Sequence, residues 1–135
     1  MTKKDIKKIK EHAKQKNVLY IEDDVIMNVT LKESLKMIFN ECYSAEHGQE
    51  ALDIFKNKKT DLIITDLEMP VMDGIKFIET IKNIEKTTPP IIVTSAYNDV
   101  PEYFYKLLNL GIENNLTKPF NTDELLKAIY KAFFE

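Results

Sequence analysis

The sequence contains no arginine, a single cysteine and no long apolar run. Because all 19 basic residues are lysines, the planar guanidinium group that reads guanine or binds phosphate at two points is absent. Cys42 alone cannot form an internal disulfide, no segment approaches the roughly 20 apolar residues that span a bilayer, and the N-terminus lacks the apolar core of a signal peptide. These absences predict a cytoplasmic protein that contacts neither nucleic acid nor a membrane directly.

The length of 135 residues, 44% of them hydrophobic, allows one domain with a conventional core. Residues 1–16 hold seven lysines against two acidic residues, a local charge of +5 within a net charge of −3. We expect them to form a basic helical leader that precedes a domain over residues 17–135. Its apolar side, Ile6, Ile9 and Ala13, is thin, so two interpretations remain open: a solvated or frayed segment, or a helix that packs on the domain or joins an upstream segment.

Short apolar runs alternate with segments of helical period, which predicts βαβ units and a parallel sheet. The predicted strands are residues 17–21, 42–45, 61–65, 90–94 and 112–116, the last of them weak, and the first, third and fourth should be central. The predicted helices span about residues 25–39, with Met27, Leu31, Leu35 and Ile38 inward, then 48–55, 75–84, a segment from the N-cap Asn98 to Gly111, and a last helix opened by the capping pair Asn121 and Glu124.

Acidic, hydroxyl and ammonium groups follow these strands at their carboxyl ends, where ligand sites of open parallel sheets form. They are Glu22, Asp23 and Asp24 after the first strand, Asp66 after the third, Thr94 and Ser95 at the fourth, and Thr117 and Lys118 after the fifth. Clustered carboxylates require a positive partner, and hard oxygen ligands suit Mg²⁺. The pattern predicts that Asp66 attacks a phosphoryl group while Ser95 and Lys118 bind its oxygens. Singly, these residues have simpler explanations, since Asp23 or Asp24 and Asp73 could be helix caps.

The chain from Asn17 to Phe134 resembles the receiver domain of response regulators, of the chemotaxis regulator type. The resemblance is carried by YIEDD, HGQEAL, ITDLEMPVMDG, PIIVTSA and LTKPF, in this order and spacing. It implies a flavodoxin-like, doubly wound α/β fold with a five-stranded parallel sheet of order 2-1-3-4-5, here with an extra N-terminal helix. It also implies a two-component phosphorelay function, in which a kinase phosphohistidine phosphorylates the domain and the same site later hydrolyses the acyl phosphate.

Position by position, the resemblance assigns roles to individual residues. Asp66 matches the phosphoacceptor, Glu22 and Asp23 match the metal-binding acidic pair, and the backbone carbonyl of Glu68 matches a further Mg²⁺ ligand. Ser95 matches the switch hydroxyl, with Thr94 as an alternative register. Lys118 matches the lysine that is typical of the family, and the resemblance implies a cis peptide bond between it and Pro119. The side chains of Glu68 and Tyr97 resemble the pair that tunes hydrolysis. Asn115 departs from the pattern, because the family usually has a mobile aromatic residue there.

The resemblance implies two kinds of protein partner: a histidine kinase or phosphotransfer protein, and a downstream protein bound at the face of the fourth receiver helix, fifth strand and last helix. We considered two other functions. An aspartyl-nucleophile phosphatase would have a second Asp where Glu68 stands, and a flavodoxin-like ligand-binding module would need a phosphate-binding loop rich in Ser, Thr and Gly. The sequence does not name the kinase, the signal, the oligomeric state or any attached output domain.

Overall fold

The computed structural model describes residues 1–96 and 101–135, in which helices and strands alternate along the chain. In chain order the elements are α1 (Lys3–Ala13), β1 (Asn17–Ile21), α2 (Val25–Ile38), β2 (Glu41–Ala45), α3 (Gly48–Asn57), β3 (Leu62–Asp66), α4 (Gly74–Ile84), β4 (Ile91–Ala96), α5 (Pro101–Asn109), β5 (Asn115–Lys118) and α6 (Thr122–Phe134).

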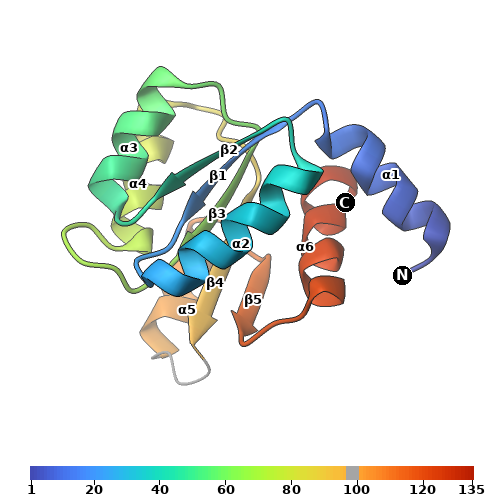
Figure 1. Ribbon diagram of the computed structural model, residues 1–135. Coiled ribbons are helices and arrows are strands. Elements are labelled where there is room, and N and C mark those ends of the chain that lie inside the picture. The colour runs from blue at the N-terminus through green and yellow to red at the C-terminus, as the bar shows by residue number, and fades with distance from the viewer. Residues whose placement is uncertain (97–100) are drawn as a thin grey trace.

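The five strands form one parallel sheet in the order β2-β1-β3-β4-β5, as predicted (Figure 1). The three strands richest in aliphatic residues, β1, β3 and β4, are central in this order, and most of their residues are buried on both faces of the sheet. The chain leaves β1 in one direction to form β2 and later returns to form β3 on the other side. The strand order therefore reverses between β1 and β3, which is where ligand sites form in such sheets.

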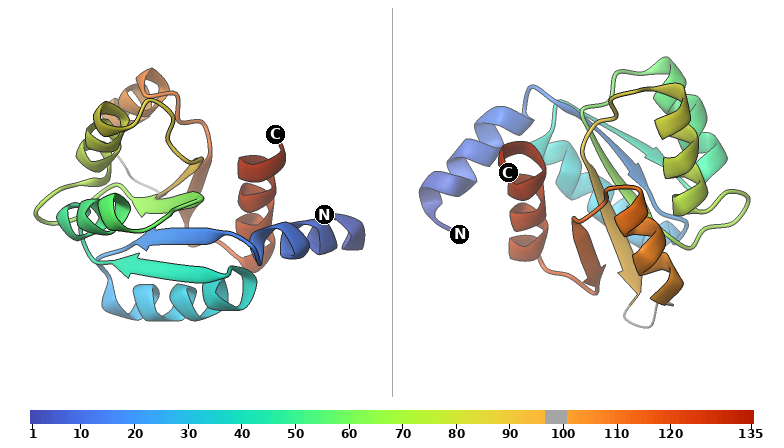
Figure 2. Two further views of the ribbon diagram at one scale, coloured as in Figure 1. Left: turned by 90° about the horizontal axis from the view of Figure 1, so that it is seen from above. Right: turned by 180° about the vertical axis from the view of Figure 1, so that it is seen from behind.

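Alternate residues of the strands belong to two apolar cores, one on each face of the sheet. Helices cover both of these faces (Figure 2). One core contains Ile63 and Val93 and is closed by α3, α4 and α5. The other contains Tyr20 and Ile64 and is closed by α2, α6 and the leader helix α1. This three-layer arrangement is the predicted α/β fold.

The leader helix α1 packs on the domain, so the interpretation of residues 1–16 as a solvated segment is wrong. Ile9 and Ala13 are fully buried, and α1 contacts α6 (Figure 1). The ring of His12 lies edge-on to Phe133 and Phe134, with centroid separations of 4.7 Å and 5.1 Å. The thin apolar stripe suffices because the aromatic residues at the end of α6 provide the other half of the contact.

The first four strands lie within two residues of their predicted limits, but the fifth begins at Asn115 and not at residue 112. Gly111, with a φ of 77°, ends the turn after α5, as expected, and the N–H of Ile112 still donates to the carbonyl of Leu107. The side chain of Asn114 donates to the carbonyl of Ala128 in α6. Residues 112 and 113 therefore complete the end of α5, and the first hydrogen bond to β4 is the one that the carbonyl of Asn114 accepts from the N–H of Val93.

Three predicted caps are present: Asp24 for α2, Asp73 for α4, and the reciprocal pair Asn121 and Glu124 for α6. The proposed cap Asn98 lies outside the described residues. The predicted inner stripe of α2 differs from expectation, because only Leu35 is fully buried and the other three members are partly exposed. Among the helices of the described ranges, none is long and apolar enough to cross a membrane.

Candidate functional site

The carboxyl ends of β1 and β3 bring three acidic side chains together. The pairing of Ile21 with Thr65 places the next residues, Glu22 and Asp66, side by side. Oxygen atoms from the carboxylates of Glu22, Asp23 and Asp66 all lie within 4.8 Å of one another. We call these three residues and Lys118 the acidic edge.

Lys118 reaches this cluster from the end of β5, two strands away from β3. Its ammonium nitrogen lies 2.6 Å from Oε1 of Glu22 and 2.9 Å from Oδ2 of Asp66. The peptide bond between Lys118 and Pro119 is cis, as the resemblance implied. Three segments that are far apart in the sequence therefore meet in one ion-paired group.

Burial shapes the electrostatics of this group. Glu22 is 1% exposed, and burial raises the pKa of its carboxyl group to about 7. The hydrogen bond from Lys118 offsets part of this rise, whereas the neighbouring Asp66 carboxylate adds to it. Burial acts to lower the pKa of Lys118, but its hydrogen bonds to Glu22 and Asp66 outweigh this and raise it. One ammonium group thus forms ion pairs with two buried carboxylates, so the acidic edge keeps an excess of negative charge.

The loop after β3 fixes the direction of Asp66. Its Oδ1 accepts a hydrogen bond from the N–H of Leu67 at 2.8 Å, while its Oδ2 faces Lys118. The N–H of Gly74 donates to the carbonyl of Leu67, and a Cβ atom at position 74 would collide with the carbonyl oxygen of Asp66. Only glycine permits this close approach, so the start of α4 holds the Asp66 loop in place.

The donor set fits a hard divalent cation. Glu22, Asp23 and Asp66 offer only carboxylate oxygens, which Mg²⁺ prefers, and Asp23 is exposed. Asp24 does not join the set, because its side chain accepts the N–H of Met27 as the N-cap of α2. Glu68 is exposed two residues after Asp66, and the role of its carbonyl as a ligand stays a prediction.

The two candidate hydroxyl groups at the end of β4 differ in exposure. Thr94 is 1% exposed, and its hydroxyl has no hydrogen-bond partner among the described residues. Ser95 is partly exposed and lines a cavity beneath α5 together with Leu67 and Asn115. Tyr97 lies outside the described residues. Of the two hydroxyls, Ser95 is the one that an incoming group can reach.

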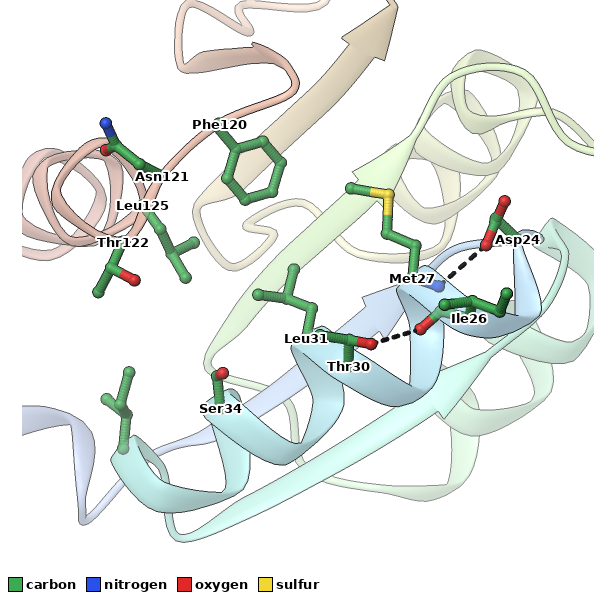
Figure 3. A pocket seen from close by; sticks show the side chains of 11 residues that line it. Asp24, Ile26, Met27, Thr30, Leu31, Ser34, Phe120, Asn121, Thr122 and Leu125 are labelled. Carbon is green, nitrogen blue, oxygen red and sulfur yellow. Dashed lines mark hydrogen bonds between the residues drawn. The ribbon is translucent and has the colours of Figure 1, made fainter.

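An apolar groove opens beside the acidic edge, between α2 and the start of α6 (Figure 3). It measures about 520 Å³ and is lined by Ile26, Met27, Leu31, Phe120 and Leu125 among others. Of the predicted inner stripe of α2, Met27, Leu31 and Ile38 line this groove, whereas Leu35 lies in the core. Sequence periodicity identifies such a stripe but does not reveal whether a neighbouring helix covers it.

Sequence reasoning missed one buried polar residue next to the site. Asn28 of α2 is 8% exposed, and its side-chain nitrogen donates to the carbonyls of Glu22 at 2.9 Å and Ala45 at 3.2 Å. The available signal was an amide residue one turn after the N-cap Asp24, on the side of α2 that also carries Leu35.

Comparison with known proteins identifies the family to which a chain with this fold and site belongs. Residues 18–130 match the response regulator receiver domain. The chain belongs to this family. It is 32% identical over 114 residues to the chemotaxis protein CheY of Halobacterium salinarum, covering 84% of this chain and 93% of that protein. It is 30% identical over 114 residues to sporulation initiation phosphotransferase F of Bacillus subtilis, covering 84% of this chain and 90% of that protein.

Solved structures of receivers have the same fold. The receiver superposes on CheY4 of Vibrio cholerae with a TM-score of 0.77 and 29% identity, covering 87% of this chain and 98% of that one. A complex of CheX, CheY, BeF₃ and Mg²⁺ from Borrelia burgdorferi matches with a TM-score of 0.77 and 27% identity, covering 88% and 90%.

Some relatives are longer than this chain. It is 32% identical over 120 residues to the transcriptional regulatory protein CrdR of Helicobacter pylori, but spans only 55% of that protein's length and 89% of its own. The matched part is the receiver alone. The receiver is a signalling phosphoacceptor of two-component systems and not a conventional enzyme, and Glu22, Asp23 and Asp66 form an acidic pocket typical of its metal-binding phosphorylation site.

Proposed function

We propose that this receiver takes a phosphoryl group onto Asp66, with Mg²⁺ bound by Glu22, Asp23, Asp66 and the backbone carbonyl of Glu68. The observation that carries the proposal is the position of Lys118, whose ammonium contacts both Asp66 and Glu22 from a separate strand. Mg²⁺ supplies charge neutralisation for the carboxylates and the phosphoryl oxygens. The domain itself spans residues 17–135, with residues 1–16 as an added helix.

In this proposal each residue acts on a defined atom. An oxygen of the Asp66 carboxylate attacks phosphorus, and an acyl phosphate bond forms as the bond from phosphorus to the donor nitrogen breaks. The electron pair of the broken bond returns to that nitrogen. Lys118 holds a transferred phosphoryl oxygen by its positive charge, and the hydroxyl of Ser95 donates to another. Water later attacks the same phosphorus, the bond between phosphorus and the Asp66 oxygen breaks, and inorganic phosphate leaves as the carboxylate is restored.

The phosphodonor is a histidine kinase or a phosphotransfer protein in this proposal, as the relation to phosphotransferase F supports. Such a protein has to present a phosphorylated imidazole to Asp66 while resting on the neighbouring surface. The apolar groove (Figure 3) offers that surface together with Val25 and Ile26 of α2, which are exposed and follow Glu22 and Asp23 closely in the chain.

The downstream partner is a protein that binds the face formed by α5, β5 and α6. Phe104, Tyr105 and Leu108 of α5 are 55%, 66% and 46% exposed, which is a large apolar surface for a single helix. Ser95 lies beneath α5, so its movement toward a phosphoryl group would alter this face. Because Asn115 replaces the usual aromatic residue, the coupling in this receiver relies on the hydroxyl and not on a ring from β5.

The test is incubation with Mg²⁺ and a small-molecule phosphodonor, followed by intact-mass measurement. The wild-type chain should gain the mass of one phosphoryl group, and Asp66→Asn should gain none. Asp61→Asn is the matched control, because it removes a carboxylate at the opposite end of the same strand and should be phosphorylated normally. Equal mass gain in wild type and Asp66→Asn would contradict the proposal, and continuous turnover of a phosphate ester would favour a phosphatase instead.

A further inference from the structure

The side chain of Asn28 is a buried amide on a helix face that otherwise packs against the sheet. It is 8% exposed and lies on α2 with the fully buried Leu35. Burying an amide in place of an aliphatic side chain costs free energy unless its polar atoms find partners. Apolar packing therefore does not account for asparagine at this position, whereas the two carbonyls it binds do.

These two carbonyls lie at the ends of neighbouring strands. The nitrogen of the Asn28 side chain donates to the carbonyl of Glu22, just after β1, and to the carbonyl of Ala45, the last residue of β2. The N–H of Glu22 itself donates to the carbonyl of Ala45 at 3.0 Å. One side chain thus joins the first turn of α2 to both strand ends.

The carbonyl of Glu22 belongs to the peptide unit that links Glu22 to Asp23. This unit is planar, so a hydrogen bond that fixes its carbonyl also fixes the direction in which the next residue leaves. Glu22 and Asp23 are two of the three carboxylates of the acidic edge. A hydrogen bond to this carbonyl therefore constrains the backbone from which both side chains project, although the Asn28 side chain donates to neither carboxylate in the hydrogen bonds described.

The neutrality of the amide suits this position. A lysine or arginine here would offer its charge to Glu22 or Asp23 and compete with both Lys118 and a divalent cation. An aspartate would point an acceptor at two carbonyl oxygens and add negative charge beside three carboxylates. An asparagine donates two hydrogen bonds and leaves the charge of the acidic edge unchanged.

We infer that Asn28 is a positioning residue for the Mg²⁺ site, which orients Glu22 and Asp23 by holding the peptide unit between them. This inference rests on the proposed function, because it assigns Asn28 a part in the same site. Mutation of a residue that hydrogen-bonds to a metal-binding residue typically lowers metal affinity by about 10- to 100-fold. Asn28 should have an effect in this range.

The test compares Asn28→Ala with Leu35→Ala, a second truncation on the buried side of α2 that lies away from the acidic edge. Both variants lose stability, but only Asn28→Ala should raise the Mg²⁺ dissociation constant, by about tenfold in a calorimetric titration. Asn28→Ser keeps one donor on a shorter side chain and should fall between Asn28→Ala and wild type. Without Mg²⁺, hydrogen exchange of the Glu22 N–H should quicken more in Asn28→Ala than in Leu35→Ala, where it should rise only with the loss of global stability.

The outcomes separate this inference from the proposed function. If wild type gains no phosphoryl group on Asp66, the proposed function itself is wrong. If wild type is phosphorylated and Asn28→Ala binds Mg²⁺ as tightly as wild type, only the role of Asn28 is overturned. Two further outcomes would also overturn the inference, because they would make Asn28 a residue of general stability. One is a loss of Mg²⁺ affinity in Leu35→Ala as large as in Asn28→Ala. The other is that both Asn28 variants fail to fold while Leu35→Ala folds.

Discussion

Lys118 supplies the ammonium group that contacts both Glu22 and Asp66. With all carboxylates ionised, the acidic edge carries three negative charges and one positive charge, so a divalent cation brings it to neutrality. Glu22 is the residue most affected by this balance, because it is buried and shares Lys118 with Asp66. Burial is the main cause that raises the pKa of Glu22 to about 7, and the neighbouring Asp66 carboxylate adds to the rise.

The raised pKa of Glu22 predicts a pH dependence of stability in Mg²⁺-free buffer. Its carboxyl group titrates near 4.5 in an unfolded chain and near 7 in the folded one. Between these values the folded chain binds more protons, so the free energy of unfolding should fall as the pH rises, by on the order of 1 to 3 kcal/mol. Urea unfolding at intervals from pH 4.5 to 7.5 measures this fall, which Glu22→Gln should remove.

The control for this experiment is Glu33→Gln on α2, because the Glu33 side chain is 69% exposed. Its pH profile should follow that of wild type. Parallel profiles for wild type and Glu22→Gln would mean that Glu22 does not titrate in this window, and the account of the charge balance would then be wrong.

Val71, in the loop between β3 and α4, holds an unfavourable backbone conformation. Its φ of 69° lies in the left-handed region, which a β-branched residue rarely adopts, and its side chain is 81% exposed. Val71→Asn should therefore raise the free energy of unfolding by about 0.5 to 1 kcal/mol, since asparagine tolerates this region and little packing is lost. Met37→Asn, at an 89% exposed helical position, should give no gain. A lower urea midpoint for Val71→Asn would show that the valine side chain makes a stabilising contact.

At the scale of elements, the sequence predicted the features that depend on residues close together in the chain, such as helix caps. Caps such as Asp73 and Asn121 act within one helical turn, so their spacing is visible in the sequence. The fifth strand was misplaced at its start because the limits of β5 depend on where α5 ends and on the contact of Asn114 with α6. Propensity carries no information about such contacts.

The site shows the same division between local and distant information. Glu22, Asp23, Asp66 and Lys118 were predictable because parallel strands bring their carboxyl ends to one edge. Asn28 was not, because its partners become visible only when α2 lies across the ends of β1 and β2. The docking of α1 likewise depends on the aromatic end of α6, more than 100 residues away.

The packing of α1 predicts that Ile9 contributes strongly to stability. Ile9 is fully buried between α1 and the core that α6 closes, so Ile9→Ala should lower the free energy of unfolding by about 2 to 5 kcal/mol. Ile6→Ala, at a partly exposed position of the same helix, should cost clearly less. Urea unfolding of the two variants measures the difference. Equal, small losses would indicate that α1 does not stay docked in solution.

For the whole molecule, the position of α1 separates the positive and negative charge. The leader carries +5 and precedes the amino end of β1, whereas the acidic edge follows its carboxyl end, and the remainder of the chain carries −8 (Figure 1). Five residues of strand at about 3.3 Å each span about 16 Å, which exceeds the Debye length of about 8 Å at physiological salt. The lysines of α1 therefore do not cancel the field of the acidic edge, and the net charge of −3 understates its attraction for cations.

Mg²⁺ should consequently stabilise the entire fold, because its carboxylate ligands follow two different strands of one sheet. A ligand that binds only the folded chain adds about 1.4 kcal/mol at ten times its dissociation constant, which raises Tm. The gain should be larger at pH 7.5 than at pH 5.5, since protons occupy Glu22 at the lower pH and compete with the metal ion. Thermal unfolding with MgCl₂, compared with NaCl at equal ionic strength, measures the gain, and Asp23→Asn should abolish most of it. A gain of equal size in Asp23→Asn would place the cation elsewhere on the acidic surface.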